Sequence, residues 1–293
     1  MKRYDRKNLG KLLPFPSPDA HKYSRGKLVL FAGSLRYPGA AILAAKASQR
    51  AGAGYTEVFT APTSVPLIQA SSPSLVVRSW EEATPSALVS SNLKRPCAYC
   101  VGPGFDADND DCVAFLSTIV LTHTSAPVLV DGGALSFLAT PEGRALCKKR
   151  SGEGLLTLIT PHGGEAARLA APLNLSLDNP AALARSLAQS YGVVCVLKGP
   201  DTIVSSGEDL IVLNAGTAAL AKAGTGDVLA GIIGAFLAQG MDGLDAAVLG
   251  ATLQGTAGSL AAEAYTPISV VAENVIDYIP AAIQDILSLK TAR

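Results

Sequence analysis

The chain has 293 residues, of which 48% are hydrophobic, and its 24 basic residues balance 24 acidic ones. This length holds one large α/β domain or two small ones, and the apolar content is enough for a substantial core. Zero formal net charge argues against a surface for nucleic acid, and no apolar run reaches the roughly 18 residues of a membrane span.

In the first part of the chain, a basic segment precedes alternating strand and helix patterns. We expect residues 1–21 to form a solvated N-terminal arm, with no apolar segment behind it that would make a secretory signal. A strand-like run at Lys27–Ala32 is followed by a turn at Gly33–Gly39 and an alanine-rich helix at Ala40–Arg50.

The rest of the chain continues this alternation, apart from residues 71–95, which show no clear period. Further strands are predicted at Tyr55–Thr60, Ala98–Val101, Pro127–Val130, Leu155–Ile159 and Val193–Leu197, with a hairpin of Thr202–Ser205 and Leu210–Leu213. Helices are predicted at residues 108–122, 228–240, 242–264 and 272–288. Repeated strand–helix–strand order predicts a single α/β domain over residues 1–293, with a mostly parallel central sheet and helices on both faces.

Five scattered cysteines include a pair with the spacing of a metal site, Cys97 and Cys100. Residues three apart on a strand face opposite sides, so this pair cannot grip one ion. We interpret the cysteines as buried thiols of a cytoplasmic protein.

The stretch Gly224-Thr225-Gly226-Asp227 stands directly before an apolar helical pattern. Backbone N–H groups point out of such a helix start and favour a phosphate or an oxyanion. Asp227 is then either a helix cap or a base that takes a proton from a hydroxyl, while the Gly224–Gly226 amides hold a transferring phosphoryl group.

Other polar residues follow the predicted strands, at the edge where open α/β sheets bind ligands. Each also has a purely structural interpretation. Asp131 could cap a helix, Lys198 could be a solvated lysine, His162 could bond a neighbour in its turn, and Glu165 could favour a helix dipole. Their convergence on one rim of one sheet favours the functional interpretation.

A series of motifs occurs in one order along the chain: Gly33-Ser34 with Tyr37 and Gly39-Ala40-Ala41, Gly102-Pro103-Gly104, Asp131-Gly132, Thr160-Pro161-His162 with Glu165, Lys198-Gly199 with Thr202, and Ala223-Gly224-Thr225-Gly226-Asp227-Val228-Leu229-Ala230-Gly231. This series resembles the ADP/ATP-dependent NAD(P)H-hydrate dehydratases of the ribokinase-like fold. The likeness covers nearly the whole chain.

The resemblance implies repair of NADH or NADPH that has added water at C6 of the reduced ring, as the S-epimer (NADHX or NADPHX). Asp227 would accept the proton of the C6 hydroxyl as the terminal phosphate of ADP, or ATP, is transferred to it. The implied contacts with the hydrate are Tyr37, Ala41, Gly104, His162 and Asp227, and those with the nucleotide are Lys198, Gly199, Pro200, Asp201, Thr202, Gly224, Thr225 and Gly226. Glu165 would position Mg²⁺ through water.

The resemblance also implies a homotetramer. Bacterial bifunctional members carry an epimerase domain ahead of this one, for which we expect no room here. Three positions depart from the family pattern: Gly133 stands where a second aspartate is usual, Gly163 where a proline is usual, and Gly216-Thr217-Ala218-Ala219 where Gly-Asn-Pro-Gly is usual.

Two competing functions stay open. A kinase of a vitamin alcohol or sugar on the same fold would leave a stable phosphorylated product. A nucleotide-binding protein without catalysis is the other alternative. It is favoured by the departures at Gly133 and residues 216–219, and opposed by the retention of Asp227 with Gly224–Gly226.

Overall fold

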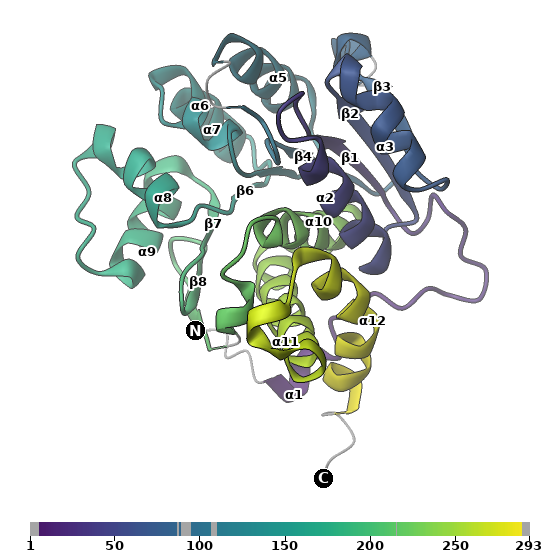
Figure 1. Cartoon of the computed structure of the whole chain (residues 1–293). Helices are drawn as coiled ribbons and strands as arrows, with labels where there is room; N and C mark the ends of the chain where they lie inside the picture. Colours follow the sequence, from purple (N-terminus) through teal and green to yellow (C-terminus); the bar gives the residue numbers. More distant parts are fainter. Residues whose placement is uncertain (1–5, 87, 89–94, 107–109, 215, 289–293) are drawn as a thin grey trace.

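The centre of the fold is a sheet of nine strands within the residues that the computed structural model describes, which are 6–86, 88, 95–106, 110–214 and 216–288 (Figure 1). The strand order is β3-β2-β1-β4-β5-β6-β7-β8-β9, parallel from β3 to β7, with β8 and β9 antiparallel. The strands are β1 (Lys27–Phe31), β2 (Tyr55–Thr60), β3 (Val76–Ser79), β4 (Cys97–Val101), β5 (Val128–Val130), β6 (Thr157–Ile159), β7 (Val194–Leu197), β8 (Thr202–Ser205) and β9 (Leu210–Leu213).

The strand order reverses direction between β1 and β4. From β1 the chain proceeds outward to β2 and β3, whereas from β4 it proceeds the other way to β9. Such a reversal point is where open α/β sheets bind ligands. The loops that follow β1 and β4 touch here, because the N–H of Gly33 donates to the carbonyl oxygen of Pro103 at 2.8 Å.

Helices cover both faces of the sheet. One face carries α1 (Arg6–Leu9), α2 (Pro38–Arg50), α3 (Val65–Ser71), α10 (Thr225–Ala238), α11 (Gly243–Ser269) and α12 (Ala272–Ser288). The other carries α5 (Asp110–His123), α6 (Ala134–Leu138), α7 (Pro141–Gly152), α8 (Gly163–Ala170) and α9 (Pro180–Tyr191). Alternate residues of β1 point to opposite layers, since Leu28 and Leu30 join the first core and Val29 and Phe31 the second.

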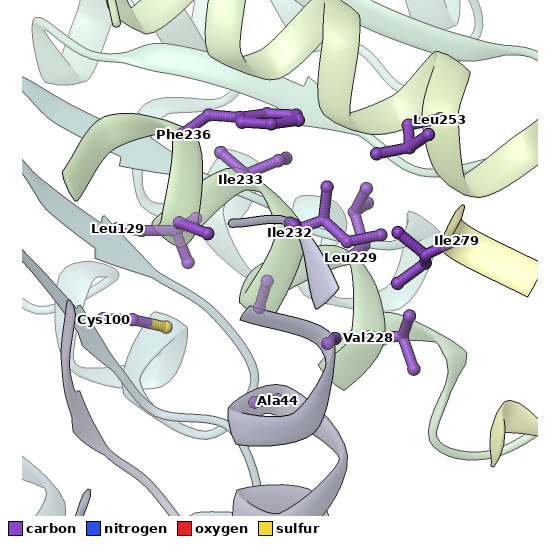
Figure 2. Packing of buried hydrophobic residues seen from close by; sticks show 14 of the residues in the cluster. Ala44, Cys100, Leu129, Val228, Leu229, Ile232, Ile233, Phe236, Leu253 and Ile279 are labelled. Carbon is purple, nitrogen blue, oxygen red and sulfur yellow. The ribbon is translucent and has the colours of Figure 1, made fainter. Parts of the chain in front are cut away.

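Helix α10 lies in the middle of the first layer. Every residue from Val228 to Ala238 is buried, as expected for a helix that is apolar all round. Figure 2 shows its side chains close to Leu253 of α11 and Ile279 of α12. A Cβ at Gly231 would lie 2.2 Å from the carbonyl oxygen of Ala44 in α2, so glycine is what allows these two helices to touch.

The predicted fold class is observed, and the differences concern single elements. The stretch without a clear period contains β3, an added edge strand. The predicted helix start at residue 108 lies outside the described residues. The expected solvated arm is in part packed, because Leu9 and Leu13 are buried in the first core. Cys97 and Cys100 are buried on β4, as predicted, and no helix among the described residues is long and apolar enough to cross a membrane.

The contact between α2 and α10 can be tested with two glycines. Gly231→Ala should lower the free energy of unfolding by about 1–3 kcal/mol, because its Cβ would press on backbone that cannot move aside cheaply. Gly152→Ala is the control, since a Cβ there meets nothing within 4 Å, and it should change stability by no more than about 1 kcal/mol. Chemical denaturation measures both, and equal effects would contradict the close packing.

Candidate active site

The carboxyl ends of β5, β6 and β7 and the start of α10 bring four charged residues together. These are Asp131 after β5, Glu165 in the first turn of α8, Lys198 after β7, and Asp227 in the first turn of α10. Lys198 Nζ lies 3.0 Å from Asp131 Oδ1 and 3.8 Å from Glu165 Oε2. A Cβ at Gly226 would be 3.4 Å from the same Nζ, so the ammonium group lies beside the loop that carries Asp227.

Lys198 is a partly buried, ion-paired cation rather than a solvated lysine, because its side chain is 21% exposed and contacts two carboxylates. Burial by itself lowers the pKa of Lys198, but the attraction of Asp131 and Glu165 outweighs it, and the net pKa is raised. The backbone fixes this position as well, because the N–H of Lys198 donates to the carbonyl oxygen of Pro161 at 2.8 Å. The site therefore contains a permanently charged ammonium group.

Asp131 anchors that cation and does not cap a helix. Its side chain is 4% exposed, and its Oδ1 accepts hydrogen bonds from Lys198 Nζ and, at 2.5 Å, from Thr160 Oγ1. The residue at the N-cap of α6 is Gly133 instead. The sequence placed Asp131 at a strand end without a role, and only the spatial neighbours Thr160 and Lys198 show that it is a positioning residue.

Asp227 is not the cap of its helix. The N-cap of α10 is Gly224, which has a positive φ of 90° and no side-chain cap hydrogen bond, and Asp227 is the third residue of the helix. Burial raises the pKa of Asp227 to about 7, with repulsion from Asp131 and Glu165 adding to the rise and Lys198 opposing it. A carboxylate with this pKa can act as a base near neutral pH.

The loop before Asp227 is held from inside the protein. Thr225 Oγ1 donates to the carbonyl oxygens of Leu220 and Lys222 at 2.8 and 2.9 Å, and the buried Gln254 of α11 donates to the carbonyl of Thr225. The N–H groups of Gly226 and Asp227 belong to the first turn, where donors have no partner within the helix. These N–H groups are therefore held in place and can donate hydrogen bonds to a phosphoryl group.

His162 and Glu165 form a reciprocal cap at the start of α8. His162 Nδ1 accepts from the N–H of Gly164 at 3.0 Å and of Glu165 at 3.5 Å, while Glu165 Oε2 accepts from the N–H of His162 at 2.7 Å. This arrangement makes Nδ1 the acceptor and leaves Nε2 with the proton. Burial raises the pKa of Glu165, against the attraction of Lys198.

Three of the five predicted contacts for the hydrate, Tyr37, Ala41 and Gly104, follow the ends of β1 and β4. Gly104 is in contact with the loop after β1, because a Cβ there would meet Ala40 Cβ at 2.5 Å and the carbonyl oxygen of Tyr37 at 2.6 Å. Tyr37 is 48% exposed, whereas Ala41 has no exposed surface. A role for Ala41 in binding stays a prediction.

Five of the predicted nucleotide contacts, residues 198–202, form the turn between β7 and β8, whereas Gly224, Thr225 and Gly226 lie at the start of α10. Gly199, Pro200 and Asp201 are exposed there, and Thr202 begins β8. A Cβ at Gly216 would lie 2.7 Å from the carbonyl oxygen of Pro200, so the segment ahead of η4 (Ala218–Leu220) packs on this turn. The nucleotide assignment of residues 198–202 stays a prediction.

Comparison with known proteins decides the family. The family model described as NAD(P)H-hydrate dehydratase matches residues 28–281. The chain belongs to this family. It is 31% identical over 276 residues to the ADP-dependent (S)-NAD(P)H-hydrate dehydratase of Xanthomonas campestris, and the match covers 91% of each protein. The chain also matches bifunctional NAD(P)H-hydrate repair enzymes, of whose length it spans about half.

Solved structures agree with this assignment. The ADP/ATP-dependent NAD(P)H-hydrate dehydratase of Bacillus subtilis, co-crystallised with ATP/Mg²⁺, is 26% identical and superposes with a TM-score of 0.77 over 96% of this chain and 97% of that one. A ribokinase-like superfamily protein of Enterococcus faecalis, 24% identical, gives a TM-score of 0.77 over 97% and 95%. The predicted family and the ribokinase-like fold are therefore confirmed.

The departures from the usual dehydratase pattern have structural counterparts. A Cβ at Gly133 would lie 2.7 Å from the carbonyl oxygen of Phe105, so a second aspartate does not fit this backbone. Gly163 opens α8 with nothing within 4 Å of a Cβ. Thr217 caps η4, since its Oγ1 accepts from the N–H of Ala219 at 3.3 Å.

The side chains of the described residues do not form a metal site made of protein ligands alone. Among the described residues, no group of three or more His, Cys, Asp and Glu side chains could hold an ion. Glu165 Oε2 is engaged by the N–H of His162, whereas Oε1 has only a 3.6 Å contact with His162 Nε2. This fits a Mg²⁺ ion that keeps its waters and is held largely by nucleotide phosphates.

The raised pKa of Asp227 predicts a pH profile. We expect kcat/KM to rise with pH through about 7, because only the ionised carboxylate can accept a proton. Asp131→Asn removes one of the charges that raise the pKa of Asp227. The acidic limb of this variant's profile of kcat/KM against pH should therefore move to lower pH. The exposed Asp277→Asn is the control. An unchanged limb in Asp131→Asn would show that the two carboxyl groups do not interact.

The cap formed by His162 can be separated from ligand binding. His162→Ala should lower the free energy of unfolding by about 1 kcal/mol, whereas His162→Asn should keep the cap, because asparagine is a favoured N-cap residue. If the imidazole contacts the hydrate, both variants should raise KM for it. Wild-type KM in His162→Asn would leave His162 a purely structural residue.

Proposed function

We propose that the chain dehydrates the S-epimer of NADHX or NADPHX to the reduced cofactor, driven by cleavage of ADP or ATP. The observation that carries this proposal is the partly buried Asp227, with a pKa of about 7, in the first turn of α10 beside the ammonium group of Lys198. Membership of the dehydratase family supports the substrate class.

Asp227 acts as the base of the first step. It removes the proton of the C6 hydroxyl as the oxygen attacks the terminal phosphorus of the nucleotide, so an O–P bond forms and the phosphoanhydride bond breaks. The lone pair of the ring nitrogen then expels phosphate from C6. Loss of the proton at C5 restores the reduced ring, with free phosphate and AMP (from ADP) as the other products.

The fixed N–H groups of Gly226 and Asp227 and the charge of Lys198 stabilise the transferring phosphoryl group. The lysine cannot give up its charge near neutral pH, since its pKa is raised. Because Asp131 and Thr160 hold it in place, its position need not reorganise during the reaction.

Residues 198–202 form the nucleotide subsite in this proposal, as fixed backbone at a strand end. One bound AMP unit cannot place both the β-phosphate of ADP and the γ-phosphate of ATP at Asp227 unless the phosphate chain folds differently, so we expect one nucleotide to be preferred. The ADP-dependent relative from Xanthomonas campestris favours ADP. Bound Mg²⁺ offsets the charge of the nucleotide phosphates, and Glu165 is the residue placed to orient its waters. The cytoplasmic location inferred from the cysteines and the homotetramer implied by the family likeness both stay predictions.

One assay with a matched variant tests the proposal. Purified NADHX is incubated with protein, Mg²⁺ and either ADP or ATP, and recovery of reduced-cofactor absorbance and release of phosphate are measured together. Asp227→Asn should retain nucleotide binding and lose about 10²-fold or more in turnover, the scale expected for loss of a general base. ADP should give the higher kcat/KM.

The outcomes separate the competing functions. A stable phosphorylated product without reduced cofactor would indicate the kinase alternative. Nucleotide binding without turnover of any hydrate would indicate a binding protein, and wild-type turnover in Asp227→Asn would refute the assignment of the base.

A further inference from the structure

A glutamine of α11 is bonded from the interior of the protein to the loop that carries Asp227. Gln254 is 7% exposed, and every residue of α11 from Ala246 to Gly258 is buried around it. Its side-chain Nε2 donates a hydrogen bond to the carbonyl oxygen of Thr225, the first residue of α10. A buried amide group requires a partner, and here that partner is the backbone directly before Asp227.

The packing of α11 fixes where this amide group lies. Gly250, Gln254 and Gly258 are spaced four residues apart, so they share one face of the helix. A Cβ at Gly250 would lie 2.6 Å from Ile233 Cγ1 of α10. A Cβ at Gly258 would lie 2.8 Å from Leu220 Cδ2 of η4. The two glycines therefore let this face of α11 approach both elements closely, with Gln254 between them.

The acceptor belongs to the same peptide unit as one of the N–H groups that face the phosphoryl group in the proposed function. The carbonyl group of Thr225 and the N–H of Gly226 lie in one plane and point in opposite directions. A hydrogen bond that fixes the direction of the carbonyl therefore also fixes the direction of the N–H. Because hydrogen bonds in a chain polarise one another, the bond from Gln254 also makes this N–H a stronger donor.

The flanking backbone gives this peptide unit little restraint of its own. Gly224 and Gly226 stand on either side of Thr225, and glycine restricts φ and ψ less than any other residue. The hydroxyl group of Thr225 holds the segment before the peptide unit, through two backbone carbonyl oxygens of that segment. Gln254 holds the peptide unit itself.

We propose that Gln254 is a positioning residue for phosphoryl transfer. By donating to the carbonyl of Thr225, it keeps the N–H of Gly226 directed at the phosphoryl group on which negative charge develops. This inference rests on the proposed function, in which that N–H stabilises the transferring group. Gln254 acts through the backbone and touches neither substrate, so its contribution concerns the transition state rather than binding.

Steady-state kinetics of two glutamine variants test the inference. Gln254→Met keeps a long unbranched side chain without the donor. It should lower kcat about 10-fold or more, below the roughly 10²–10³-fold cost of removing such a donor altogether, while KM for the hydrate and for ADP changes by less than about 2-fold. Gln239→Met is the matched control, because Gln239 Nε2 also donates to backbone carbonyl oxygens, those of Ala51 and Ala235, at the opposite end of α10. This control should leave kcat within about 2-fold of wild type.

The peptide unit can also be observed without substrate or turnover, which separates this inference from the proposed function. Thr225-Gly226 is the only Thr-Gly pair in the sequence. Protein labelled with ¹³C at the threonine carbonyl carbon and with ¹⁵N in glycine therefore gives one signal in an NMR spectrum that selects directly bonded ¹³C–¹⁵N pairs. Gln254→Met should move this signal, whereas Gln239→Met should leave it in place.

The outcomes decide the inference in either direction. A moved signal together with a fall in kcat at constant KM supports it. An unchanged signal in Gln254→Met, wild-type kcat in that variant, or an equal loss of kcat in Gln239→Met would overturn it. Gln254→Leu, which also lacks the donor, takes the place of Gln254→Met if the methionine variant does not fold. If the wild type turns over neither hydrate, the proposed function fails, and the labelled peptide signal still decides whether Gln254 fixes the Gly226 amide.

Discussion

The electrostatic balance of the site depends on one partly buried ammonium group. Lys198 faces three carboxyl groups, those of Asp131, Glu165 and Asp227, so negative charge is in excess when all are ionised. The carboxyl groups do not share the lysine equally. Asp131 accepts the hydrogen bond from Lys198 Nζ and also one from the hydroxyl of Thr160. The carboxyl group of Asp227 is desolvated and is repelled by the neighbouring carboxyl groups. Burial is the largest cause of its raised pKa, repulsion by Asp131 and Glu165 adds to the rise, and Lys198 opposes it.

The apolar part of the structure is what makes that arrangement rigid. Helix α10 is buried along its length and touches α2 where Gly231 meets the backbone of Ala44. The start of the helix, with Gly224 in a conformation that favours glycine, is therefore fixed relative to the sheet. Close-packed interiors do not deform continuously, so the N–H groups at this end and the carboxyl group of Asp227 stay in register with the ends of β5 and β7.

The rim divides into two parts with different chemistry. On the β5–β7 side the charged groups are buried or partly buried, and Lys198 is paired with Asp131 and Glu165, which suits a phosphoryl group that must be held in one geometry. On the β1–β4 side, Tyr37 and Arg36 are exposed. The strand order reverses between β1 and β4, which is where open α/β sheets bind ligands.

The sequence by itself determined the fold class, the family, and the loop that carries Asp227, because strand–helix alternation and glycine-bounded helix starts are local patterns. It also gave correct bounds, within a few residues, for most of the central strands. The short strand β3 and the packed N-terminal helix were not evident, since both depend on neighbours elsewhere in the chain.

The roles of individual polar residues were decided only by the tertiary structure. Asp131, Thr160 and Lys198 are separated by tens of residues, and their hydrogen bonds exist because parallel strands end at a common edge. The structure excludes Asp227 as the N-cap of α10, because that position belongs to Gly224. His162 and Glu165 are each other's caps as well as candidate ligands. Sequence patterns report on local backbone, whereas burial and charge pairing arise between segments that are distant along the chain.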